Sequence, residues 1–156
     1  MVDSISSSLP SIAELVPHAG AMSLLDCVVA AEGERLVAEV VVPEAGLFNR
    51  EDGVGAWVGL EYMAQAVAAW AGWQGRQAGH APRIGFLLGT RRYRSAVARF
   101  EPGQRLRVEI QRSYQADNGL GQFDCHIHCG EAELASATIT VFGPEDPREF
   151  LKGETP

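Results

Sequence analysis

The chain has 156 residues, of which 46% are hydrophobic and 21% are charged. A domain of this length buries about 70% of the surface of its unfolded chain, so it can keep a core without disulfides. These values exclude a disulfide scaffold, a disordered chain and a multidomain enzyme. The 13 basic and 20 acidic residues give a net charge of −7, which argues against general nucleic-acid binding.

The N-terminal residues and the cysteines indicate a reduced, cytoplasmic protein. Residues 1–8 have neither the positive charge nor the apolar core of a signal peptide, and the three cysteines are an odd number. Residues 54–72 are almost uncharged, as in a membrane span. Glu61 and Gln65 lie near the middle of this stretch, and alanine and glycine supply much of its apolar character, so we expect a buried helix and no membrane contact.

The predicted elements form a single domain, 1–156, with its core over 11–143 and a polar tail over 144–156. A short helix follows the capping-box spacing of Ser11 and Glu14 and ends before Pro17. Periodicity and turn residues then predict two strands, a loop, one long helix and four strands in an antiparallel meander. Their ranges are 22–31 and 36–42 for the strands, 43–55 for the loop, 56–75 for the helix, and 83–93, 105–114, 121–129 and 133–142 for the last strands. The fold class is α+β, with one sheet around one helix.

The long helix carries the first candidate for chemistry. Glu61 has apolar neighbours, and Gln65 lies four residues on, so the two side chains share a face and can form a hydrogen bond. Two interpretations have equal weight on the residues alone. Glu61 is either a helix-start acid stabilised by the helix dipole, or a buried general acid.

His18 is the second candidate. Pro17 fixes the backbone on one side, and Gly20 leaves room for a ligand on the other. A single histidine is more often structural than catalytic. Together, however, His18 and a buried Glu61 would supply the general base and the general acid of one reaction.

The remaining clusters give weaker signals. In a strand, His126 and His128 face away from Cys125 and Cys129, so we expect no metal site there. Nine of the thirteen basic residues lie within 76–112, and the densest group is Arg91, Arg92 and Arg94. This group is either a docking site for an anionic partner or a solvated strand edge.

Five segments resemble the β-hydroxyacyl-carrier-protein dehydratases. They span most of the domain, in the order 15–18 (LVPH), 22–26 (MSLLD), 60–66 (LEYMAQA), 86–89 (FLLG) and 100–103 (FEPG). More narrowly, residues 56–65 (AWVGLEYMAQ) and 85–93 (GFLLGTRRY) are similar to the dehydratase-like proteins of aryl polyene pigment clusters.

The resemblance implies a hot-dog fold, in which an antiparallel sheet wraps around one long central helix and two subunits pair as a homodimer or with another hot-dog dehydratase. It implies no cofactor beyond the phosphopantetheine arm of an acyl carrier protein, which carries the substrate as a thioester. Glu61 matches the family's helix acid, and the N–H groups of Ala56 and Trp57 match the helix start that polarises the thioester carbonyl.

Further roles follow for the residues around the helix acid. We expect Gln65 to orient Glu61, and Arg91, Arg92 and Arg94 to dock the carrier protein. The acyl chain is expected in a tunnel lined by Pro17, Tyr62, Met63, Phe86 and Leu88.

One segment departs from the family pattern. The family has its main histidine in a His-Phe-Pro loop about fourteen residues before the helix acid, whereas residues 47–52 read LFNRED. Either His18 takes the role of the base, or the chain does not dehydrate alone. We favour His18, and so predict a dehydratase that converts a 3-hydroxyacyl thioester to the trans-2-enoyl thioester. The alternatives are a hot-dog thioesterase and a non-catalytic partner subunit.

Overall fold

A computed structural model describes residues 9–15, 23–46, 48–50, 53–79 and 86–142. The helical elements are α2 (Ile12–Leu15), a single 3₁₀ turn η2 (Ala56–Val58) and α3 (Gly59–Gln77). The strands in chain order are β1 (Cys27–Glu32), β2 (Arg35–Val41), β3 (Asn49–Arg50), β4 (Gly53–Gly55), β5 (Phe86–Ser95), β6 (Arg99–Phe100), β7 (Arg105–Gln115), β8 (Leu120–Cys129) and β9 (Ala132–Phe142).

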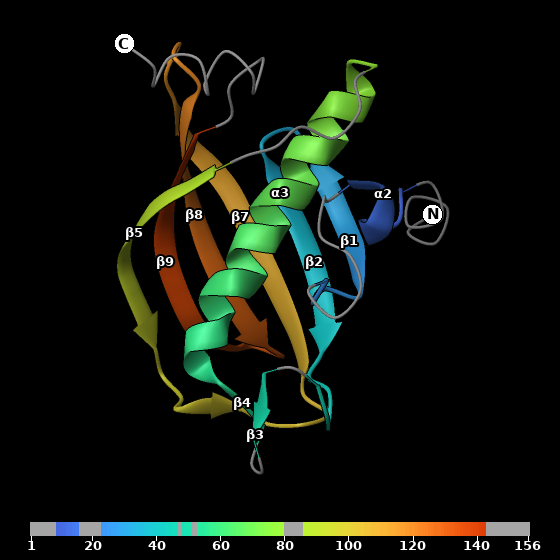
Figure 1. The fold of residues 1–156 in the computed structure, drawn as a ribbon, viewed down its shortest axis with the longest axis vertical. Helices are drawn as coiled ribbons and strands as arrows, with labels where there is room; N and C mark the ends of the chain where they lie inside the picture. Colours follow the sequence, from blue (N-terminus) through green and yellow to red (C-terminus); the bar gives the residue numbers. More distant parts are fainter. Residues whose placement is uncertain (1–8, 16–22, 47, 51–52, 80–85, 143–156) are drawn as a thin grey trace, which may run out of the picture.

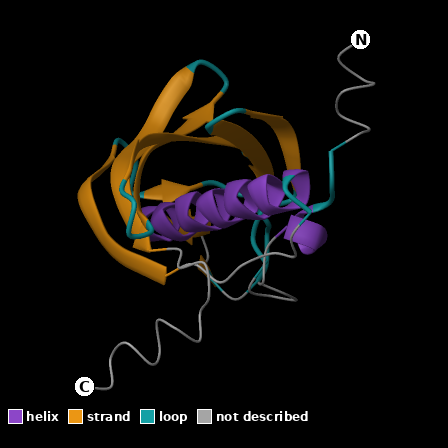
Figure 2. Cartoon of the chain, turned by 90° about the horizontal axis from the view of Figure 1, so that it is seen from above, coloured by secondary structure: helices purple, strands orange, loops and turns teal. Residues whose placement is uncertain are grey.

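Six strands form one antiparallel sheet that curves around α3. Their order is β1-β2-β7-β8-β9-β5. Figure 1 shows α3 crossing the concave face of this sheet. Figure 2, a view from above, shows the sheet curving around the helix. The predicted hot-dog architecture is therefore confirmed.

The order of the last strands differs from the predicted meander. Strands β7, β8 and β9 follow one another as expected, but β5 pairs with β9 at the far edge of the sheet. The predicted loop 43–55 also contains β3 and β4, which form a separate three-stranded sheet with β6. Strands of two or three residues are too short to show a periodicity in the sequence.

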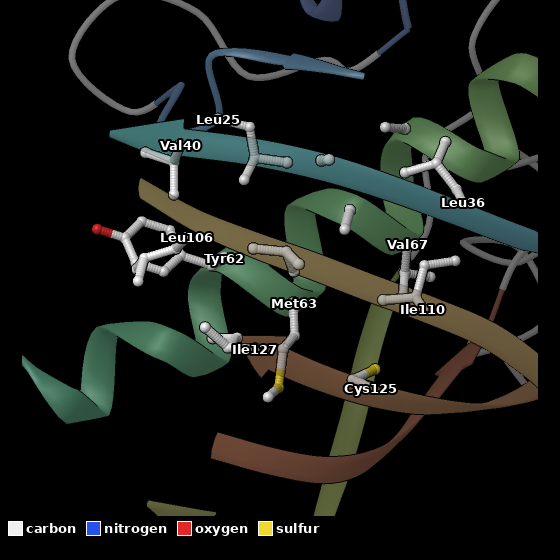
Figure 3. Close-up of a cluster of buried hydrophobic side chains, with 14 of the residues drawn as sticks. Leu25, Leu36, Val40, Tyr62, Met63, Val67, Leu106, Ile110, Cys125 and Ile127 are labelled. Atoms are coloured by element: carbon white, nitrogen blue, oxygen red, sulfur yellow. The ribbon is translucent and has the colours of Figure 1, made fainter. Parts of the chain in front are cut away.

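Alternating side chains place the core between the sheet and the helix. Leu106, Val108 and Ile110 of β7 are fully buried and alternate with more exposed residues, as in a strand with one face on the core. Helix α3 contributes Met63 and Val67 to the same cluster (Figure 3). Burying an aliphatic side chain of this size contributes about 1.5–3 kcal/mol.

The prediction of a buried helix is only partly correct for α3. Gln65, Ala66 and Ala69 are fully buried, whereas Ala71 is exposed and Ala68 is half-buried. One face of α3 is therefore not covered by the described residues.

A glycine in α3 allows a second helix to pack closely. A β-carbon on Gly72 would overlap the carbonyl oxygen of Leu15 and lie 2.8 Å from its carbonyl carbon. The end of α2 therefore rests directly on the backbone of α3.

We expect Gly72→Ala to lower the free energy of unfolding by about 1–3 kcal/mol, because the backbone of Leu15 must move. The same change in an open helix position would be favourable, since alanine has the higher helix propensity. Urea unfolding measures the effect. Gly89→Ala is the control, because a β-carbon on Gly89 has no heavy atom of the described residues within 4 Å. Equal stability of the two variants would contradict the packing of α2 on α3.

Candidate active site

Glu61 and Gln65 lie on adjacent turns of α3 and are joined by a hydrogen bond. The side-chain amide of Gln65 donates to Oε1 of Glu61 at 3.2 Å, and its carbonyl oxygen accepts the N–H of Leu24 at 2.9 Å. Gln65 has no exposed surface, while Glu61 is half-buried in the first turn of the helix. The buried amide therefore ties the carboxylate to Leu24, which lies 41 positions before Gln65 in the sequence.

The start of the helix carries the two predicted backbone donors, Ala56 and Trp57, in the turn η2. The N–H of Ala56 donates to the carbonyl oxygen of Ala98 at 3.0 Å, so this donor is already used within the fold and the prediction for Ala56 is wrong. Trp57 is the next residue of the first turn, where N–H groups have no partner within the helix. Among the predicted oxyanion donors, the structure therefore favours Trp57.

Tyr93 fixes this helix start from strand β5. Its hydroxyl donates to the carbonyl oxygen of Ala56 and lies over Gly59, where a β-carbon would collide with it. Burial raises the pKa of Tyr93 above its usual value, so the phenol keeps its proton near neutral pH. This role of Tyr93 could not be predicted from the sequence, because the contact joins residues 37 apart in sequence.

A cavity of about 280 Å³ lies beside the helix start, on the side of Tyr62. Burial, and secondly the charge of Asp26, raise the pKa of Tyr62 to about 12, so its hydroxyl is a hydrogen-bond donor at neutral pH. Apolar side chains dominate the wall, and the lining residues are Ser23, Leu24, Asp26, Val41, Pro43, Ala45, Gly46, Phe48, Asn49, Val54, Val58 and Tyr62. Leu24 belongs both to this wall and to the hydrogen-bond chain of Glu61.

Of the predicted tunnel residues whose side chains the structure describes, Tyr62 lines this cavity and Met63 does not. Met63 is fully buried in the core. Figure 3 shows the sulfur of Met63 near Ile127 and Cys125. Met63 points away from the cavity because successive residues of a helix are rotated by about 100°. The structure describes the backbone of Phe86 and Leu88 in β5 but not their side chains.

Pro17 and His18 lie outside the described residues. The described chain resumes at Ser23, one residue before the N–H group that binds Gln65. The role of His18 therefore stays a prediction.

The three predicted docking arginines lie on another surface. Arg91, Arg92 and Arg94 belong to β5 and are exposed, with Arg92 in a left-handed conformation (φ 56°) at a bulge. Arg94 is paired with Ser136 of β9, and Ser136 is paired with His126 of β8. The residues on either side of His126 are buried in the core, so His126 lies on the opposite face of the sheet. Directly paired residues share a face of a sheet, so Arg94 lies on the convex face, opposite α3. The structure does not bring this group to Glu61.

The cysteines and histidines of β8 alternate as the sequence predicted. Cys125 is fully buried in the core, and His126 and His128 lie on the other face beside Glu133, at 2.5 and 3.9 Å. Within the described part of the chain, no three histidine, cysteine or acidic side chains are grouped as metal ligands would be. His126 and Glu133 form an ion pair when the histidine is protonated.

The cysteines should differ strongly in reactivity. Burial, and secondly the charges of Glu39 and Asp26, raise the pKa of the exposed Cys27 above 9.0, so its alkylation should increase as the pH rises past this value. Burial raises the pKa of Cys125 much further. We expect iodoacetamide to modify Cys27 in the native protein and Cys125 only after unfolding, as measured by peptide mapping. Equal rates at both residues would contradict the placement of Cys125.

Comparison with known proteins agrees with this geometry. The sequence model of the ApeP-like family, described as ApeP dehydratase, matches residues 10–152. The chain belongs to the ApeP-like dehydratase family. The similarity to the dehydratase-like proteins of aryl polyene clusters is thus confirmed. No curated protein sequence matches the chain.

Solved structures show the same fold. The dehydratase heterocomplex ApeI:P from Xenorhabdus doucetiae contains a chain that is 26% identical, with a TM-score of 0.85, and the match covers 95% of this chain and 99% of that one. Two further structures are similar in fold. A hypothetical thioesterase with coenzyme A from Streptococcus pneumoniae is 14% identical, with a TM-score of 0.60, and the match covers 74% of this chain and 83% of that one. The PaaI protein of E. coli is 15% identical, with a TM-score of 0.59, and the match covers 74% of this chain and 80% of that one. None of the described helices of this ApeP-like protein is long and apolar enough to cross a membrane.

Proposed function

We propose that this ApeP-like protein removes water from a 3-hydroxyacyl thioester carried by an acyl carrier protein. The product is the trans-2-enoyl thioester. The observation that carries the proposal is the chain of hydrogen bonds from Glu61 through the fully buried Gln65 to the backbone of Leu24. A buried amide with both ends engaged holds a carboxyl group in one orientation, as acid catalysis requires.

Each step of the elimination has a group to perform it. His18 takes the α-hydrogen as a proton, and the electron pair of that C–H bond forms the new double bond. The C–O bond to the β-hydroxyl breaks, and Glu61 donates the proton with which this oxygen leaves as water. The N–H of Trp57 stabilises the negative charge that develops on the thioester oxygen.

The hydrogen bond to Gln65 also selects which oxygen of Glu61 acts as the acid. Oε1 accepts the N–H of Gln65, so the transferable proton belongs on Oε2. After the proton transfer, the same N–H stabilises the carboxylate. The acyl chain is proposed to lie in the cavity of about 280 Å³, against Tyr62, Phe48 and Val58.

A second candidate function is that of a partner subunit that binds the carrier protein without performing the chemistry. The observation that favours it is the loop that replaces the family's His-Phe-Pro segment. Phe48 packs edge-to-face on Trp57 with ring centres 5.7 Å apart, and the side-chain amide of Asn49 donates to the carbonyl oxygen of Pro43 at 2.6 Å. Neither side chain is an acid or a base, so neither supplies the proton acceptor that the family's histidine provides. We propose assembly with a second hot-dog dehydratase subunit, since the similar Xenorhabdus doucetiae structure is a heterocomplex.

Intact mass spectrometry of a 3-hydroxyacyl carrier protein tests the proposal. Incubated with the purified protein alone, the carrier should lose the mass of one water. Unchanged mass, with water loss only after a second dehydratase subunit is added, would favour the partner role. Loss of the whole acyl group would show a thioesterase and contradict the proposal.

A further inference from the structure

The small sheet beside the start of α3 forms a trough with an arginine on each side. Arg50 of β3 is paired with Gly53 of β4, and Arg99 of β6 is paired with Gly55 of the same strand. Gly53 and Gly55 are two residues apart, so they belong to one face of the sheet, and directly paired residues share that face. The two arginines therefore flank a central strand that has no side chain on this face, since Val54 belongs to the other face. Figure 1 shows β3 and β4 beside the first turn of α3.

The trough encloses a pocket of about 350 Å³. Its described lining consists of Arg50, Gly53, Gly55, Trp57, Ala98 and Arg99. It lies on a different surface from Arg91, Arg92 and Arg94, because it belongs to the second sheet and adjoins η2.

Trp57 closes one end of the trough. Its side chain is 61% exposed, which is unusual for tryptophan, and Phe48 supports it edge-to-face. A β-carbon on Gly55 would lie 2.5 Å from the indole nitrogen Nε1. The glycine therefore makes room for the indole, whose Nε1–H group lies against Gly55 in the lining of the trough.

The polar side chains among the described lining are all hydrogen-bond donors. Each guanidinium offers five N–H groups and the indole offers one, and neither side chain accepts. Such a set fits an acceptor-rich anion, and two arginines in the lining of one hollow suit the oxygens of a phosphate. Two of the six described lining residues are arginines, although the chain as a whole carries a charge of −7.

We propose that this trough binds the phosphate group of the phosphopantetheine arm that carries the acyl thioester. The assignment of the phosphate to this arm rests on the proposed function. Trp57 then has two roles, since its indole faces the phosphate while its backbone N–H, in the first helical turn, faces the thioester. The carrier protein would approach the end of α3 where the small sheet lies, and not the convex face of the large sheet.

Binding of small probes tests the trough without any turnover. The probes are 4′-phosphopantetheine, pantetheine without the phosphate, and inorganic phosphate, each titrated by calorimetry and by the indole N–H signal of Trp57 in NMR spectra. We expect the phosphorylated probe to bind at least about tenfold more tightly than pantetheine, which is the size of one charge-assisted hydrogen bond. The ratio should fall close to one in the Arg50→Gln/Arg99→Gln double variant.

Arg91→Gln/Arg94→Gln is the matched control, because it removes the same charge from the convex face and should leave the ratio unchanged. Thermal unfolding establishes that both double variants are folded. Equal affinities for the two pantetheine probes, or equal losses in both double variants, would overturn the proposal. Binding of inorganic phosphate as tight as that of 4′-phosphopantetheine would overturn the assignment to the arm. Because no probe carries a hydroxyacyl group, failure of the dehydration assay would not affect this result.

Discussion

Glu61→Gln is expected to lower the rate of water loss about 10²–10⁴-fold, the usual contribution of a positioned general acid. Glutamine keeps the size of the side chain and its carbonyl oxygen can still accept from Gln65, but it has no proton to donate to the departing hydroxyl. Single-turnover mass spectrometry of the 3-hydroxyacyl carrier protein gives the rate directly. The free energy of unfolding should change little, since Glu61 is only half-buried.

Two further variants make this result specific. Glu32→Gln removes an acid at the exposed end of β1 and should leave the rate unchanged. His18→Ala should abolish turnover if His18 is the base. Full activity of both Glu61→Gln and His18→Ala would contradict the catalytic assignment. If the chain is a non-catalytic partner, the rate of water loss measured with a second dehydratase subunit should be the same for either variant as for the unchanged protein.

The sequence predicted the elements of the fold better than their arrangement. The strands predicted over 105–114 and 121–129 correspond to β7 and β8, in each of which buried and more exposed residues alternate. The pairing of β5 with β9 could not be predicted in the same way. It joins Phe86 to Phe142, and no local pattern specifies a partner at that separation. Consecutive strands are usually neighbours, which made the meander the default expectation.

The candidate site was predictable where it depends on helix geometry. The spacing of Glu61 and Gln65 alone brought the two side chains together, and the structure shows their hydrogen bond. The spacing could not show that the other end of the Gln65 amide binds Leu24. Nor could it show that Ala98 occupies the N–H of Ala56, because both contacts join distant segments.

The trough illustrates the same limit. Arg50 and Arg99 are 49 positions apart in sequence, and only the register of three very short strands sets them on either side of Gly53 and Gly55. The densest run of arginines, in contrast, lies on the convex face away from the helix start. Density of charge along the sequence was therefore a poor guide to charge near the site, since strand register decides which face each side chain occupies.

Gln65→Leu should affect both stability and catalysis. Leucine has a similar volume but no polar group, so the N–H of Leu24 would lose its acceptor and Glu61 its donor. An unsatisfied buried group costs about 1–3 kcal/mol, and urea unfolding should show a loss of this size. A carboxyl group that is no longer held in place should reduce kcat about 10²-fold, because misplacement by about 1 Å has effects of that order.

Val67→Ala separates the positioning of Glu61 from mere destabilisation. Val67 is buried in the same helix and has no role in the hydrogen-bond chain, and its truncation should cost a similar 1–3 kcal/mol or so through the cavity that it leaves. At a temperature where both variants are folded, Val67→Ala should keep its kcat. Gln65→Leu should lose kcat with little change in KM for the acyl carrier protein, since Gln65 acts through Glu61 and not on substrate binding. Equal values of kcat in the two variants would mean that Gln65 only stabilises the fold, and that the orientation of Glu61 depends on other contacts.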